Sequence, residues 1–394
     1  MSKKLLFEEI LIDITDYELI EELGQGGCGA AYKAKNKKTN EEVALKVIFK
    51  SIREISQISK QREILREVCI PCQLNSPGIV PLLGFRFPIP EEELKRKPPP
   101  KMKIPKGVGK RPVTSEDFNG AIYITKLMKY KSIENYMKQY LNLKGSCKGI
   151  KMNPTIRSKI IFGVASTMKR VHNQMIIHRD LKLQNVFLDE NLEPRIADFG
   201  LARVITPDVQ MTMNIGTPIY MAPELFQGDT NYDSSVDVYA FAMFLYFMFM
   251  PAPIFEPKIR SPNQMAIKIY NGQRPLNDGS IPAHYWDLIQ KCWDHSPLKR
   301  PTFADIVNIL KDDKYAIKEF DKETDLDDLH EYQMRMEDYE DVPSSFASTI
   351  SNVSLIETAS GEKIKITDSS ISFADDHRET DDEERKTEFN WDRH

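Results

Sequence analysis

The sequence predicts an α+β fold in which a strand-rich amino-terminal part precedes a larger, mainly helical part. Residues 17–49 form short runs of strand-forming residues separated by glycine and asparagine turns, which is typical of antiparallel strands. Residues 155–174 are predicted to form a long helix, and residues 238–250 are apolar on every side. The latter run ends at Pro251 and is too short to cross about 30 Å of hydrocarbon, so we expect a buried central helix.

Length and composition are those of a globular protein whose charge is unevenly distributed. The 394 residues are 41% hydrophobic and 28% charged, which suffices for a full core. Residues 314–394 contain 10 Lys and Arg against 23 Asp and Glu, whereas the first 313 residues carry a net charge of +9. We expect residues 312–394 to be an acidic, Ser/Thr-rich tail that is disordered, with some helix in 314–342, and we expect no nucleic-acid partner.

The cysteines and the amino terminus indicate neither disulfides nor a targeting segment. The chain has five cysteines, and Cys69 and Cys72 form a C-x-x-C pair that has no second pair to complete a zinc site. Two buried thiols are therefore favoured over a metal or redox site. Residues 1–16 carry acids within their apolar stretch, unlike a signal peptide, and are interpreted as a lead-in. We expect a cytoplasmic protein that does not insert into membranes.

Residues 176–200, IIHRDLKLQNVFLDENLEPRIADFG, combine groups suited to proton transfer and to cation binding. The pattern predicts a loop, a short strand, a turn at 189–191 and a second strand that ends in an acidic turn. Asp180 on the loop can accept a proton from a hydroxyl group. Asn185 and Asp198 can supply the hard oxygen ligands that Mg²⁺ prefers.

This stretch resembles the catalytic loop and the metal-binding turn of eukaryotic protein kinases, as HRDLKLQN from His178 and as Asp198-Phe-Gly. The resemblance implies that Asp180 accepts the proton of the substrate hydroxyl or orients it, and that Lys182 neutralises the γ-phosphate. It also implies that Asn185 and Asp198 hold Mg²⁺, or Mn²⁺, against the phosphates of ATP.

The resemblance covers residues 17–311 and implies a bilobal protein-kinase-like fold. A small β-rich N-lobe would span 17–125, a hinge 126–128 and a larger, mainly helical C-lobe 129–311. Residues 88–111, rich in proline and lysine, interrupt the N-lobe without a helix or strand pattern. They are interpreted as a surface insertion, or as a docking element for an acidic surface such as the tail.

A glycine-rich segment lies between the first two predicted strands. Gly24, Gly26 and Gly29 could close a dinucleotide-binding turn before a helix, but strands rather than a helix follow them. Without Cβ atoms, their N–H groups can approach phosphate oxygens. The resemblance implies that Lys46 holds the α- and β-phosphates, and that the other ATP-binding residues are Leu23, Ala31, Ala44, Glu67, Thr125, Met128 and Phe187.

One of these positions departs from the usual pattern, and a proline complicates the helix that carries another. Ala31 replaces the valine that usually covers the adenine, which predicts a thinner apolar roof and weaker nucleotide binding. The helix predicted over 51–74 carries the partner of Lys46; Glu63 and Glu67 share one face, and the spacing to the following strand, 79–83, favours Glu67. Pro71 should end or kink this helix.

Motifs in the second half indicate the type of kinase. Lys182 and the segment 216–224, GTPIYMAPE, resemble the serine/threonine type, with Thr217 expected near Asp180. Cys292-Trp293 and the segment 297–303 resemble the tyrosine-kinase-like group of serine/threonine kinases and the tyrosine kinases. The resemblance further implies that Asp237 braces the backbone of the catalytic loop and that Arg300 pairs with Glu224.

The loop over 201–215 is a candidate for regulation. Arg179 precedes the catalytic aspartate and can pair with a phosphate on Thr206 or Thr212, added by an upstream kinase or by autophosphorylation in trans. The leading hypothesis is an active serine/threonine kinase with protein substrates, in intracellular signalling. The rival is a nucleotide-binding scaffold, which Ala31, Pro71, the insertion and the tail favour. A metabolite kinase is a third hypothesis, which the segment 216–224 disfavours.

Overall fold

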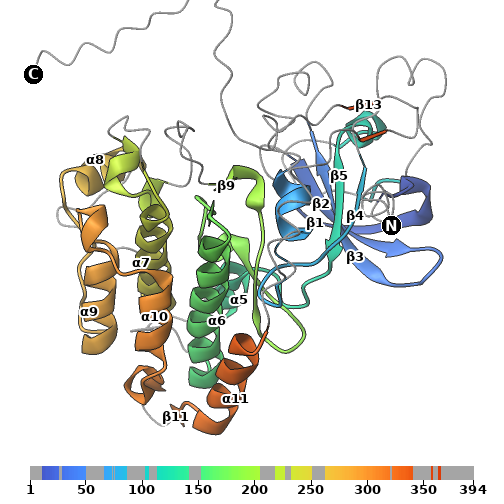
Figure 1. Cartoon of the computed structure of the whole chain (residues 1–394). Helices are drawn as coiled ribbons and strands as arrows, with labels where there is room; N and C mark the ends of the chain where they lie inside the picture. Colours follow the sequence, from blue (N-terminus) through green and yellow to red (C-terminus); the bar gives the residue numbers. More distant parts are fainter. Residues whose placement is uncertain are drawn as a thin grey trace, which may run out of the picture.

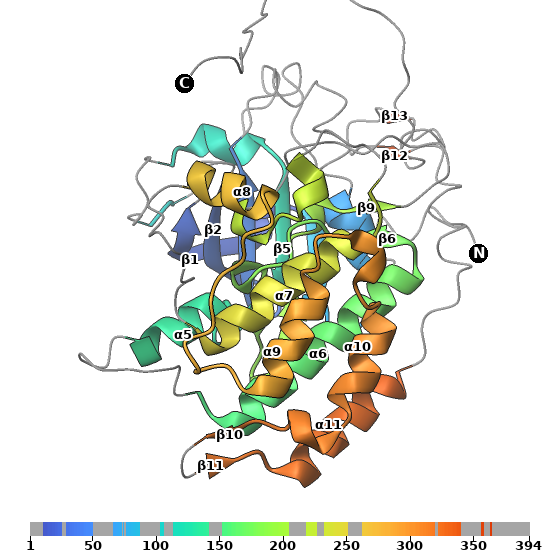
Figure 2. The ribbon, with the colours of Figure 1, turned by 90° about the vertical axis from the view of Figure 1, so that its left-hand side faces the viewer.

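The computed structural model confirms an α+β fold with a β-rich and a helical lobe (Figure 1). Seen from the side, the helices stand below and in front of the sheet (Figure 2). The structure describes residues 11–25, 29–49, 66–72, 74, 76–86, 103–105, 113–141, 152–204, 218–226, 232–250, 262–319, 322–339, 356–357 and 363–364. The sequence predictions that fall on other residues, including most of the insertion over 88–111, lie outside this description.

The N-lobe is built on one antiparallel sheet of five strands in the order β1-β2-β3-β5-β4. The strands are β1 (Tyr17–Gln25), β2 (Gly29–Asn36), β3 (Glu42–Ile48), β4 (Leu82–Arg86) and β5 (Ile122–Lys126). A Cβ on Gly29 would lie 2.2 Å from the carbonyl oxygen of Val47, so only glycine lets β2 approach β3 this closely. The strand expected over 79–83 begins three residues later, as β4.

The lead-in belongs to the folded lobe from residue 11 onward. The Ile12 N–H donates to the Phe85 carbonyl over 3.1 Å, and Leu11 forms a parallel bridge with Phe85 at the outer edge of β4. Ile14, in the short 3₁₀ helix η1 (Ile14–Asp16), is buried in the core of this lobe. The apolar residues of the lead-in therefore cover a sheet edge.

The helix that carries Glu67 is described from Arg66. Residues 66–72 and 74 are helical, so the helix continues through Pro71 and its last described residue lies three positions beyond it. A proline in a helix removes one hydrogen bond, here the one to the carbonyl of Glu67. Val68, Ile70 and Leu74 are buried, and their packing outweighs this loss close to the end of the helix.

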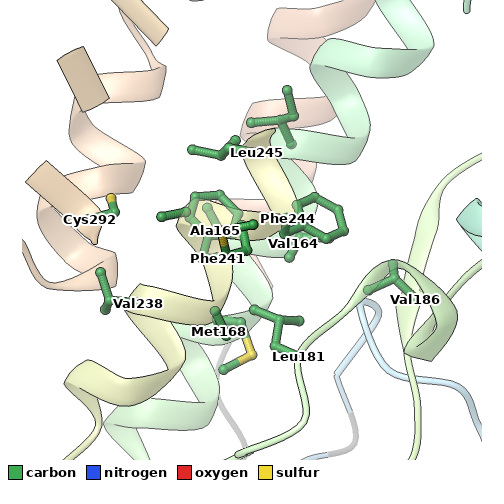
Figure 3. Packing of buried hydrophobic residues seen from close by; sticks show 14 of the residues in the cluster. Val164, Ala165, Met168, Leu181, Val186, Val238, Phe241, Phe244, Leu245 and Cys292 are labelled. Atoms are coloured by element: carbon green, nitrogen blue, oxygen red, sulfur yellow. The ribbon is translucent and has the colours of Figure 1, made fainter. Parts of the chain in front are cut away.

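The C-lobe surrounds one apolar helix. Its helices are α5 (Ile133–Leu141), α6 (Pro154–Asn173), α7 (Ser235–Phe249), α8 (Pro262–Tyr270), α9 (Ala283–Cys292) and α10 (Phe303–Leu310). Figure 3 shows Val164, Ala165 and Met168 of α6 packed with Phe241 and Phe244 of α7. The predicted burial of 238–250 and the predicted helix 303–310 are confirmed. No helix in the described parts of the chain is both long and apolar enough to cross a membrane.

Short elements connect these helices and carry the candidate site. Two small antiparallel ladders pair β6 (Ile176–Ile177) with β9 (Arg203–Val204), and β7 (Val186–Leu188) with β8 (Pro194–Ile196). The strands β7 and β8, with the turn between them, form what we call the catalytic hairpin. The 3₁₀ helices are η2 (Ser115–Asn119), η3 (Leu183–Asn185), η4 (Phe199–Leu201), η5 (Pro218–Tyr220), η6 (Pro223–Phe226), η7 (Pro297–Lys299) and η8 (Asp313–Tyr315).

Residues 312–319 and 322–339, here named the C-terminal segment, are ordered, so the expected disorder is wrong for them, whereas the expected helix within 314–342 is confirmed. The segment contains β10 (Lys318–Glu319), β11 (Lys322–Glu323) and α11 (Leu326–Glu337), and α11 packs beside α6 (Figure 1). Leu329, Tyr332 and Met336 lie three and four residues apart and are buried, because they form one apolar stripe within an acidic sequence. A further ladder pairs β12 (Ile356–Glu357) with β13 (Lys363–Ile364).

Candidate active site

A cavity of about 810 Å³ lies between the sheet and the catalytic hairpin, and most of the predicted ATP-binding residues line it. Residues from both lobes form its wall. The predicted residues on this wall are Leu23, Gly24, Ala31, Ala44, Lys46, Glu67, Thr125, Met128, Asn185, Phe187 and Asp198. Gly29, Asp180 and Lys182 are not on the wall, and Gly26 lies outside the described residues.

Lys46 joins two carboxylates at the back of the cavity. Its Nζ lies 2.9 Å from Glu67 Oε1 and 3.6 Å from Asp198 Oδ1. Burial would lower the pKa of Lys46, but the two carboxylates outweigh it and raise that pKa. The charge of Lys46 in turn lowers the pKa of Asp198, whereas burial, with Asp198 nearby, raises the pKa of Glu67. Lys46 is thus a permanent cation at this point of the cavity.

The catalytic loop holds three of the predicted residues within hydrogen-bond distance. Lys182 Nζ lies 2.6 Å from Asp180 Oδ2, and Asn185 Nδ2 donates to the same oxygen over 2.8 Å. Asn185 Nδ2 also donates to the Asp180 carbonyl over 2.9 Å. The carboxylate of Asp180 is therefore held in one orientation beside the cavity, as a group that accepts a proton in place must be.

Asp237, at the start of α7, braces this loop from inside the lobe, as predicted. Its two carboxylate oxygens accept from the backbone N–H groups of His178 and Arg179, each over 2.7 Å. His172 Nε2 lies 2.9 Å from the same side chain. Burial would raise the pKa of Asp237, but these partners, His172 first, lower it. Arg179 has a φ of 64°, a left-handed conformation that is strained for this residue and is held by this bracing.

The acidic turn after β8 is fixed to the loop by its backbone. The Ala197 N–H donates to the Asn185 carbonyl over 2.9 Å, and Asp198 adopts a left-handed φ of 69°. Phe199 is buried with its ring 4.8 Å from that of His178. This packing directs the Asp198 carboxylate to the cavity, where 41% of the side chain stays exposed.

The donor set at this turn fits a divalent cation that phosphate oxygens help to bind. The nitrogen of the Asn185 amide is used by Asp180, which leaves its oxygen for a cation. Among the described residues no group of three or more His, Cys, Asp and Glu side chains could hold a metal ion. An amide and one carboxylate are an incomplete ligand set, as is usual where Mg²⁺ is bound together with a nucleotide.

One predicted contact and one that was not predicted concern the C-lobe. Arg300 Nη1 and Nη2 lie 2.6 and 2.8 Å from the carboxylate oxygens of Glu224, which confirms this buried pair. Arg179 Nε donates to the Leu201 carbonyl over 2.6 Å, and Arg179 Nη1 to the Tyr232 hydroxyl over 2.7 Å. The phosphosite candidates Thr206 and Thr212, together with Thr217, lie outside the described residues.

Several residues that line the cavity were not predicted from the sequence. Val80, Leu82 and Ile196 add apolar surface, and Lys129, Lys131, Ser132 and Asn135 also line the cavity. Ile196 could have been predicted, because it lies in a predicted strand two positions before Asp198 and should therefore line the same cavity. The sequence contains no comparable indication for Lys131, because its left-handed φ of 60° is visible only in the structure.

Comparison with known proteins shows the family to which this fold belongs. Residues 17–310 match the protein kinase domain family. The chain belongs to this family. The kinase domain is 29% identical over 312 residues to a probable serine/threonine-protein kinase of Dictyostelium discoideum, covering 78% of this chain and 29% of that protein.

Two other relatives carry broader descriptions. The kinase domain is 28% identical over 322 residues to the dual specificity protein kinase splA of Dictyostelium discoideum, covering 77% of this chain and 12% of splA. It is 35% identical over 169 residues to the dual serine/threonine and tyrosine protein kinase of Mus musculus, covering 41% of this chain and 18% of that protein. The chain thus spans less than a third of the length of these relatives.

Proposed function

We propose that this protein kinase is active and transfers the γ-phosphoryl group of ATP to serine and threonine hydroxyls of protein substrates. The observation that carries this proposal is the arrangement of Lys46, which contacts Glu67 and Asp198 at the cavity while Asp180, Lys182 and Asn185 are in contact beside it. A scaffold that only binds nucleotide does not need the contacts among Asp180, Lys182 and Asn185.

The chemistry follows from the position of each side chain. Lys46 would hold the phosphates of ATP, and Asp180 would orient the substrate hydroxyl and take its proton as the oxygen–phosphorus bond forms. Lys182, 2.6 Å from Asp180, would offset the negative charge that develops on the transferred group. Mg²⁺, held by Asn185 and Asp198 when bound, would neutralise phosphate charge and align the phosphates.

The preference for serine and threonine rests on Lys182 and on the name of one relative. Two other relatives are described as acting on both serine/threonine and tyrosine, which makes dual specificity the second candidate. The two candidates differ in how deeply the acceptor must reach toward Asp180, because a tyrosine hydroxyl stands farther from its backbone than a serine hydroxyl.

One experiment separates these possibilities. The purified chain is incubated with radiolabelled ATP, Mg²⁺ and a generic protein substrate, with Asp180→Asn as the control, and labelled amino acids are identified after acid hydrolysis. We expect label on serine and threonine at about 100-fold or more above the control. Label on tyrosine as well would establish dual specificity. Incorporation no higher than in Asp180→Asn, with nucleotide binding retained, would favour the scaffold.

We further propose that phosphorylation of Thr206 or Thr212 raises the activity, through an upstream kinase or autophosphorylation in trans. Support comes from Arg179, which already contacts the carbonyl of Leu201 at the start of this loop and can attract a phosphate. Replacing both threonines by alanine should lower the rate after preincubation with ATP. An unchanged rate would reject this role.

A further inference from the structure

The C-terminal segment lies outside the family match, yet it contacts α6, which leads into the catalytic loop, and the turn of the catalytic hairpin. The match ends at residue 310, whereas the C-terminal segment continues to residue 339 along α6. The last residue of α6 is Asn173, and the chain runs from there into the catalytic loop. Figure 2 shows α11 at the end of the molecule opposite the sheet.

Three cations of α6 bind this segment. Arg157 pairs with Glu319 and Lys159 with Asp328. Arg170 donates to the carbonyls of Met336 and Tyr339, the latter over 2.6 Å. These carbonyls lie at the carboxyl end of α11, where a cation both completes hydrogen bonds and faces the negative end of the helix dipole. The segment is therefore fixed along most of the length of α6.

At Gly163, α6 meets both α11 and the catalytic hairpin. A Cβ at this position would lie 2.1 Å from the Tyr332 hydroxyl oxygen and 2.7 Å from Cγ of Pro194, the first residue of β8. Tyr332 is 1% exposed. Only glycine leaves room for both neighbours, so a residue of the C-terminal segment and a residue of the hairpin share one notch in α6.

A second contact reaches the turn of the hairpin. Arg335 Nη2 and Nη1 lie 2.5 and 3.2 Å from the two carboxylate oxygens of Glu193, whose side chain is 8% exposed. Such a two-bond pair fixes orientation as well as distance. Within the turn, Asp189 accepts from the N–H groups of Asn191 and Glu193 over 2.8 and 3.0 Å and pairs with Arg195 over 2.6 Å. Arg335 thus binds a turn that is otherwise stabilised internally.

The other end of the hairpin carries the residues of the proposed reaction. Asn185 directly precedes β7, and Asp198 follows the last residue of β8 by two positions. Each strand has three residues, so a displacement of the turn is carried to both side chains. Ile196 also exchanges backbone hydrogen bonds of 2.7 and 2.9 Å with Gly78 and Val80, which follow the helix that carries Glu67.

We propose that the C-terminal segment positions the catalytic hairpin for phosphoryl transfer, and that Arg335 acts on it as a positioning residue through Glu193. This proposal rests on the proposed kinase activity. It extends the functional unit beyond the family boundary to residue 339, because Asn185 and Asp198 depend on a turn that the segment holds.

The test compares Arg335→Ala with Glu337→Gln in the full chain. Glu337 also lies on α11 and also forms an ion pair with the kinase domain, 2.5 Å from Lys311, but away from the hairpin. The measured quantities are kcat and KM for ATP, the melting temperature, and the hydrogen exchange of residues 186–198. Arg335→Lys keeps the charge without the two parallel bonds, and Glu193→Gln and the Arg335→Ala/Glu193→Gln double variant complete a mutant cycle.

For Arg335→Ala we expect kcat to fall about tenfold and hairpin exchange to accelerate about tenfold, with Glu337→Gln unchanged in both. Arg335→Lys should recover part of the loss, and the double variant should be no worse than the poorer single variant. The same kcat, or the same hairpin exchange, in Arg335→Ala and Glu337→Gln would overturn the proposal. If the unmodified chain shows no transfer above Asp180→Asn, the proposed function fails, and the exchange comparison alone still decides whether Arg335 holds the hairpin.

Discussion

The cavity wall and the interior of the C-lobe use charged residues in opposite ways. On the wall, Lys46 and Asp198 keep 40% and 41% of their side chains exposed, although each faces an opposite charge. In the interior, Asp237 is fully buried and Arg300 has no exposed side-chain surface, and hydrogen bonds hold both. The wall charges can still bind a ligand, whereas the interior charges are saturated by the protein.

This contrast separates the charged residues that bind a ligand from those that stabilise the fold. A buried ion pair whose bonds are all made within the protein fixes the backbone and is costly to break from one side. A charge that remains open to a cavity costs stability and is retained for what it binds. The contrast predicts that interior substitutions change stability first, and that wall substitutions change activity first.

The largest expected effect is on the interior pair of Arg300 and Glu224. Arg300→Met leaves the Glu224 carboxylate without its two bonds of 2.6 and 2.8 Å. We expect a loss of about 3–5 kcal/mol in the free energy of unfolding. Chemical denaturation measures this loss, and the Arg300→Met/Glu224→Leu double variant should recover part of it. A loss below about 1 kcal/mol, the size of a surface ion pair, would contradict the assignment to the interior.

The next effect concerns α11. Tyr332→Ala removes a ring that is 1% exposed and opens a cavity against Gly163, so we expect a loss of about 3 kcal/mol. Met334 on the same helix is 59% exposed, and Met334→Ala should change stability by no more than about 0.5 kcal/mol. Thermal unfolding of both variants tests the difference. Equal melting temperatures would mean that α11 is not part of the folded core.

Glu67→Gln sharpens the comparison on the wall side. Removing the partner that lies 2.9 Å from Lys46 should lower the transfer rate roughly tenfold, because the lysine loses its fixed position. The effect of Glu67→Gln on the free energy of unfolding should differ from its effect on the rate. Burial, with Asp198 nearby, raises the pKa of Glu67 to about 7, so the protonated form favours the folded state.

The sign of the pH dependence follows from this raised pKa. The stabilisation from the Glu67 proton is complete below about pH 4.5 and is lost as the pH rises through about 7. Glu67→Gln should remove this part of the pH dependence and should not lower stability at pH 8. The free energy of unfolding of both proteins, measured from pH 5 to 8, tests this prediction. An identical dependence on pH in the two proteins would contradict the raised pKa of Glu67.

The smallest effect is on the roof of the cavity. Ala31 lines the cavity where a valine is usual, so Ala31→Val should add apolar contact worth about 1 kcal/mol and tighten ATP binding roughly fivefold. Lys35 is on the same face of β2 but outside the cavity, and Lys35→Ala serves as the control. Calorimetric titration with ATP compares the two. Weaker binding in Ala31→Val would show that this position has no room for a larger side chain.

The cavity wall could be predicted from the sequence because its chemistry is local. Lys46 is a cation inside an apolar strand, and Asn185 and Asp198 lie within one short stretch of the chain, so short motifs carry both the residue types and the spacing. The antiparallel strands and the buried helix α7 followed from hydrophobic patterns for the same reason. Glu67 was chosen over Glu63 by spacing alone, and the structure places it against Lys46.

Some helix within the C-terminal segment was predicted, but its packing against α6 could not be, because the stability of the segment is not local. Its composition is acidic, and only Leu329, Tyr332 and Met336 mark an apolar stripe, which is weak evidence for a helix. Two of its carboxylates pair with Arg157 and Lys159, and Arg170 donates to its backbone carbonyls; these three residues are more than 150 positions away along the chain. The helix continues past Pro71 for a related reason, since tertiary packing outweighs the local cost of a proline.

One matched pair of substitutions tests the central contrast most directly. Asp198→Asn and Asp237→Asn make the same chemical change, one at the open wall and one in the saturated interior. The measurement is the transfer rate and the melting temperature of each variant. Asp198→Asn should lose about 100-fold or more in rate and keep its melting temperature within about 2 °C, whereas Asp237→Asn should melt about 5 °C or more below the unmodified protein. Equal losses of rate and of melting temperature in the two variants would contradict the account.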